Sequence, residues 1–93
     1  MSKHYRPKKE ILLPQLFDGR FAETGVTEYW HHKFTTDRCR ILTDGENFVW
    51  VTCDDQEKVL DFTADDIGSR AILNAIRRFF QTRIVLVCNQ EVA

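Results

Sequence analysis

The sequence predicts an α+β domain in which a mostly antiparallel, curved sheet of four to five strands packs on one amphipathic helix, in the order β-β-β-β-α-β. Three observations predict this class. Segments with two-residue alternation of apolar side chains fill residues 26–62. Asp44-Gly45 has the positive-φ preference of a tight hairpin turn. Residues 72–80 repeat apolar side chains at helical spacing.

The predicted strands before the helix span residues 26–34, 38–43, 48–53 and 58–62. In the first strand, Trp30, His32 and Phe34 share one face, and its two aromatic rings mark that face as the more buried. Residues 48–53 are apolar on both faces, which is typical of a central strand. These strands therefore form the body of the sheet.

The helix is predicted to begin after Thr63, an N-cap residue that Asp66 supports three positions later. Gly68 lies near the edge of its apolar stripe, where a missing side chain permits close approach to the sheet. The opposite helix face carries Arg70, Asn74, Arg77 and Arg78. Residues 83–88 then form a last strand, apolar on both faces, which indicates a place inside the sheet or inside a dimer interface.

The chain is predicted to divide into a flexible basic tail at residues 1–10 and a single domain at residues 11–93. Four cations and few apolar side chains indicate the tail. Pro14 interrupts the apolar stretch that follows, so residues 11–17 form an edge strand, a short turn of helix or an irregular docked arm.

Composition narrows the class of protein. A formal net charge of −1 provides no overall field that attracts nucleic acid or an anionic membrane. No secretory signal and no membrane-length apolar run is present in the sequence. Three widely spaced cysteines would leave one thiol unpaired in an oxidising compartment. We therefore expect a cytoplasmic protein without a membrane partner.

No sequence motif indicates catalysis, a metal or a cofactor. His31 and His32 are adjacent on a strand and point to opposite faces, so one metal cannot easily bind both. Cys39, Cys53 and Cys88 are each flanked by apolar residues and are interpreted as small core residues. The prediction is a non-enzymatic domain without cofactors, although function follows sites rather than folds.

One helix of about 16 residues cannot cover both faces of such a sheet. The second face needs cover from the arm at residues 11–21, from sheet curvature or from another subunit. The sequence therefore predicts a binding or adaptor domain that acts through protein–protein contacts as a homodimer.

Two alternative functions use other residues. A ligand pocket between helix and sheet would be lined by Trp30, His32, Phe34 and Trp50. Nucleic-acid binding would use the basic tail and the helix arginines, namely Lys8, Lys9, Arg70, Arg77 and Arg78. The second alternative is the weaker one, because the chain lacks a net positive charge.

The run DGENFVWV at residues 44–51, followed by FT at 62–63, ILNAI at 72–76 and FF at 79–80, resembles small uncharacterised bacterial orphan proteins of the integron gene-cassette type. The resemblance covers about residues 40–87 and rests on a hairpin turn, a capped helix and a core stripe. It implies an α+β fold, a bacterial mobile gene cassette as source and a dimer, and it implies no functional residues.

Overall fold

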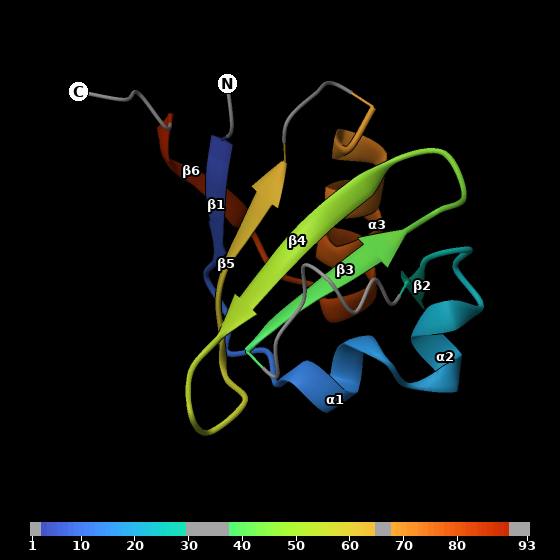
Figure 1. Ribbon diagram of the computed structural model, residues 1–93, viewed down its shortest axis with the longest axis horizontal. Helices are drawn as coiled ribbons and strands as arrows, with labels where there is room; N and C mark the ends of the chain where they lie inside the picture. The colour runs from blue at the N-terminus through green and yellow to red at the C-terminus, as the bar shows by residue number, and fades with distance from the viewer. Residues whose placement is uncertain (1–2, 30–37, 65–67, 90–93) are drawn as a thin grey trace.

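The computed structural model describes residues 3–29, 38–64 and 68–89 (Figure 1). These residues contain six strands and three helices, joined by turns and loops. In chain order they are β1 (Lys3–Pro7), α1 (Leu13–Leu16), α2 (Gly19–Ala22), β2 (Thr27–Tyr29), β3 (Cys39–Thr43), β4 (Phe48–Cys53), β5 (Val59–Ala64), α3 (Arg70–Phe80) and β6 (Ile84–Asn89).

The strands form one antiparallel sheet in the order β2-β3-β4-β5-β1-β6. The α+β class and the antiparallel, curved sheet are confirmed, and β4 is interior as its two-sided apolar pattern predicts. The sheet has six strands instead of four or five, because β1 had not been predicted.

The predicted Asp44-Gly45 hairpin joins β3 to β4. Gly45 has a φ angle of 101°, a backbone conformation that residues with a side chain rarely adopt. Asp44 Oδ1 accepts hydrogen bonds from the backbone N–H of Asn47 at 2.8 Å and of Glu46 at 3.0 Å. These two bonds, that from Asn47 first, lower the pKa of the Asp44 carboxyl below its ordinary value.

The N-terminal segment differs from the flexible tail that its composition predicts. Residues Lys3–Pro7 form β1, which lies between β5 and β6 (Figure 1). His4 pairs with Thr63 of β5 on one side and with Cys88 of β6 on the other. The prediction was wrong here because it relied on the polar side chains of this segment. Pairing on both sides provides hydrogen-bond partners for the backbone N–H and C=O groups of the strand, whatever its side chains are.

Helix α3 begins later than predicted. Thr63 does not cap it, because β5 continues through Ala64 and Thr63 pairs with Trp50 of β4 and with His4 of β1. The helix starts at Arg70, after Ser69, whose hydroxyl donates to the Phe48 carbonyl at 2.8 Å. Asp65 and Asp66 lie outside the described residues.

One face of the sheet, here called the helix face, carries the core. Val49 and Val51 of β4, Leu42 of β3 and Phe62 of β5 are fully buried there with Ile76 of α3. The segment after β1 packs into the same core, through Ile11, Leu13, Leu16 and Phe21. The Phe21 ring lies 5.2 Å from that of Phe79 and 5.6 Å from that of Phe80, between centroids.

This arrangement decides between the three predicted roles of the arm. Residues 13–16 form a short turn of helix, α1, and the arm covers the helix face instead of the other one. A helix about 10 Å across cannot cover six strands spaced about 4.8 Å apart. The arm therefore completes the cover that α3 begins.

The opposite face, here called the far face, turns toward the viewer in Figure 1, with α3 behind the sheet. Strand alternation places Trp50 and Thr52 of β4 on this face, beside Ile41 of β3 and Asp61 of β5. Ile41 is buried and Trp50 is half-buried, while the side chains toward β1 are polar. The far face is thus apolar in part only.

Candidate functional site

The last strand in the sheet order, β6, pairs with β1 alone among the described residues, so its other side is an edge. Its six residues, IVLVCN, include no charged side chain, no proline and no glycine. An edge strand presents unpaired backbone N–H and C=O groups that can pair with another strand. The apolar pattern predicted a place inside the sheet or inside a dimer interface, and in the structure the strand lies at the edge of the sheet.

Two large side chains of β6 are exposed to solvent. Leu86 is 48% exposed and Val87 is 49% exposed. Leu86 pairs with Tyr5 and His4 pairs with Cys88, so Val87 is an extra residue in a β-bulge. Before the bulge, Arg6 pairs with Val85 and Pro7 with Ile84, which keeps the first half of the strand in regular register.

A polar cluster lies on the far face, where β1 crosses beside β5. His4 Nδ1 is 3.1 Å from Asp61 Oδ2 and 3.2 Å from Thr63 Oγ1. Both carboxyl and imidazole side chains are about three-quarters buried, with 26% and 23% exposed. The other oxygen of Asp61, Oδ1, is buried and has no hydrogen-bond partner within the described part of the chain. The contacts hold the imidazole ring in one orientation.

Cys39 and Cys53 lack the properties of a nucleophile. Burial, followed by the charge of Asp61, raises the pKa of the Cys39 thiol. Burial, followed by the charge of Asp54, raises that of Cys53. A reactive cysteine requires the opposite shift, because the thiolate is the nucleophile. The cluster can therefore orient a histidine, but the two cysteines favour the protonated form.

Of the four residues predicted to line a ligand pocket, the structure describes Trp50 alone, and Trp50 does not lie between helix and sheet. Trp50 alternates with the buried Val49 and Val51, and so lies on the far face, away from α3. Trp30, His32 and Phe34 fall outside the described residues. On the helix face the core side chains themselves fill the space under α3.

The residues predicted to bind nucleic acid separate into two hollows. Lys8 and Lys9 line a surface hollow with Arg6 and Lys58, next to the carboxylate of Glu10. Glu10 forms an ion pair with Lys58 at 3.8 Å, and Lys9 Nζ donates to the Phe80 carbonyl at 3.4 Å.

Arg70 and Arg77 line a second hollow with Tyr5, between α3 and the strands β1 and β6. Arg78 is exposed and belongs to neither hollow. The five cations thus do not form one continuous set.

The proximity of His4 to Asp61 was not predicted, because the composition of residues 1–10 indicates a tail. The alternation of His4 and Arg6 with Tyr5 was the available signal for a strand, although it is short and polar. The exposed pair Leu86 and Val87 had a clearer signal, the two-sided apolar pattern of residues 83–88.

Among residues 3–29, 38–64 and 68–89, no three His, Cys, Asp or Glu side chains gather as a metal site would require. No helix in those segments is long and apolar enough to cross a membrane. Comparison with protein-family models, curated proteins and solved structures finds no match to this chain. The class that the geometry defines is an α+β domain with an uncharged edge strand, and the gene-cassette resemblance stays a prediction.

Proposed function

We propose that this chain is a non-enzymatic binding domain that acts through protein–protein contacts and associates with a second copy of itself along β6. The observation that carries the proposal is the uncharged, six-residue edge strand with Leu86 and Val87 half exposed. Main-chain pairing along such an edge provides affinity, and the side chains beside it provide specificity.

Natural sheets usually protect an edge from association with charged side chains, proline or a very short strand. The described part of β6 has none of these devices, and its bulge affects only the region of Val87. The opposite edge strand, β2, has three residues in its described range, including the charged Glu28. The contrast favours β6 as the strand that pairs with a partner.

A second copy is the partner that best fits this edge. Antiparallel pairing of a strand with itself has two-fold symmetry, and each copy then offers the same donors and acceptors to the other. A net charge of −1 causes little repulsion between copies. The regular segment Ile84–Leu86 would lie nearest to the two-fold axis, and two sheets would join into one.

The alternative functions have less support. A ligand pocket between α3 and the strands β4 and β5 would require space that Val51, Phe62 and Ile72, all fully buried, already occupy. Nucleic-acid binding would require a continuous basic surface, whereas the predicted cations lie in two hollows. Self-association needs neither feature.

The test is the mass of the native protein and of a Leu86→Lys variant, measured by light scattering after size exclusion at about 100 µM. We expect a native mass near twice the 11.0 kDa chain mass. In the variant, two ammonium groups would meet near the two-fold axis, so we expect a mass near 11.0 kDa. Because Leu86 is already 48% exposed, the lysine should not prevent folding.

Leu60→Lys is the matched control, since Leu60 is 43% exposed but lies on the interior strand β5. It makes the same chemical change away from the edge and should keep the native mass. A monomeric native protein would overturn the proposal of a homodimer. A dimer that Leu86→Lys leaves intact would overturn the assignment of β6 as its interface.

A further inference from the structure

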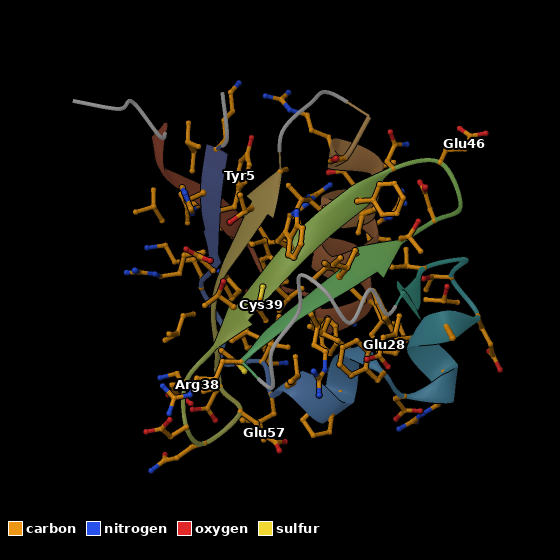
Figure 2. The ribbon with its side chains drawn as sticks, in the orientation of Figure 1. Tyr5, Glu28, Arg38, Cys39, Glu46 and Glu57 are labelled. Carbon is orange, nitrogen blue, oxygen red and sulfur yellow. The ribbon has the colours of Figure 1, made fainter. Side chains whose placement is uncertain are left out.

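The hollow between α3 and the strands β1 and β6 combines positive charge with an apolar floor. One side of α3 contributes Arg70, Leu73, Asn74 and Arg77, and the sheet contributes Tyr5 and Ile84. Figure 2 labels Tyr5 on β1, beside β5 and β6. The volume of the hollow is about 230 Å³, somewhat below the ~300–1,000 Å³ of typical ligand clefts. This volume limits an occupant to a small molecule.

Helical spacing explains why these side chains converge. Arg70, Asn74 and Arg77 stand at positions i, i+4 and i+7 and so lie along one side of α3. Leu73 on the same side is buried at the bottom. Tyr5 and Ile84 rise from the helix face of the sheet, where both are half-buried and pack against the core.

The charge of the hollow is not neutralised within the described part of the chain. None of its lining residues is acidic, and neither Arg70 nor Arg77 forms an ion pair with a described carboxylate. The basic hollow at Lys8 and Lys9 differs, because Glu10 lies in its wall. Two guanidinium groups without an acidic neighbour among the described residues favour an anionic occupant.

We propose that this hollow binds a small organic anion, with its carboxylate or phosphate group between Arg70 and Arg77 and a flat apolar body against Tyr5 and Ile84. The guanidinium fork matches both oxyanions, so carboxylates and phosphate monoesters share the same recognition chemistry. Asn74, between the two arginines, offers a further hydrogen-bond donor. This hollow shares Ile84 with the segment proposed to pair along β6, but anion binding in it does not depend on that pairing.

The test uses phenyl phosphate and phenylacetate as anionic probes, with benzyl alcohol and inorganic phosphate as controls for the charge and for the apolar body. Binding is followed by titration calorimetry and by amide chemical shifts of the native protein. We expect one of the two anions to bind with a dissociation constant on the order of 1 mM or tighter. Which probe binds more tightly distinguishes a phosphate ligand from a carboxylate ligand.

Arg70→Gln and Arg77→Gln should each weaken binding at least about tenfold, while Arg78→Gln should leave it unchanged. Arg78 is the matched control because it is an exposed arginine on the same helix, outside the hollow. Equal loss in all three variants, or no binding of either anion below about 10 mM, would overturn the proposal. Equal affinity for inorganic phosphate would overturn the role of the apolar floor.

Discussion

Gly68 lies against the turn that joins β3 to β4. A Cβ atom at this position would overlap the side-chain amide of Asn47. The sequence predicts that Gly68 lets the helix approach the sheet closely, whereas in the structure Gly68 precedes α3 and its neighbour is the Asn47 side chain of the hairpin. The backbone of Gly68 does not require glycine, since its φ is not positive.

The substitution Gly68→Ala should therefore displace the side-chain amide of Asn47, and because that amide is the end of a flexible side chain, the native protein should lose about 1 kcal/mol or less. In an Asn47→Ala background the overlapping atoms are absent, and the same substitution should be neutral or stabilising by about 0.4–1 kcal/mol through the unfolded chain. Urea unfolding of the four proteins gives the coupling free energy. Equal effects of Gly68→Ala in both backgrounds would contradict this account.

At the scale of single elements, β1 holds the sheet together. It has neighbours on both sides, β5 and β6, and without it β6 would lose the strand with which it pairs. The side chains of β1 contribute less than its backbone, because Lys3, His4 and Arg6 are polar. The strand is thus stabilised chiefly by main-chain hydrogen bonds and by Tyr5, which packs against the core.

Replacing His4 by proline should be more destabilising than replacing it by alanine, by about 1–3 kcal/mol. His4 has a strand on each side, so the N–H that proline lacks would otherwise face a ladder partner. Alanine removes the contact with Asp61 but keeps the N–H. Thermal unfolding followed by circular dichroism compares the two variants, and equal stabilities would show that β1 tolerates loss of a ladder bond.

The success of sequence reasoning also depends on the element. Strand β4 and the Asp44-Gly45 turn were predicted correctly because their signals are local, namely a short segment that is apolar on both faces and a glycine that favours positive φ. Strand β1 could not be predicted in the same way, since its partners lie at residues 62–64 and 84–89. Thr63 was misplaced for the same reason, because a distant strand pairs with it.

The candidate sites follow the same pattern. The apolar pattern of residues 84–88 was visible directly in the sequence, although the position of this strand at the edge of the sheet was not. The two hollows could not be predicted, because the fold decides which cationic side chains lie next to each other. Arg77 and Arg78 are neighbours in sequence, yet only Arg77 lines the hollow, because adjacent residues point about 100° apart around a helix.

At the scale of the whole molecule, association along β6 would link stability to protein concentration. Pairing of folded copies stabilises the native state by mass action, by about 2.7 kcal/mol for a hundredfold rise in concentration. For a dimer of this size, that energy corresponds to about 5–10 °C in the unfolding midpoint.

We therefore expect calorimetry to show a midpoint that rises by about 5–10 °C between roughly 2 and 200 µM native protein. The Leu86→Lys variant should show a midpoint that does not change with concentration, while Leu60→Lys should behave as the native protein does. A native midpoint independent of concentration would contradict a dimer coupled to folding.

Since β1 takes residues 3–7 and β6 takes residues 84–89, the two strands that neighbour each other at one end of the sheet are almost the whole chain apart in sequence. A chain emerging from the ribosome would expose β1 long before β6 is made, and β1 would be an edge strand of the sheet until then. Such long-range pairing slows folding, because the intervening loop must close first. Premature release or stalling before residue 84 would leave the backbone of Lys3–Pro7 available to other chains.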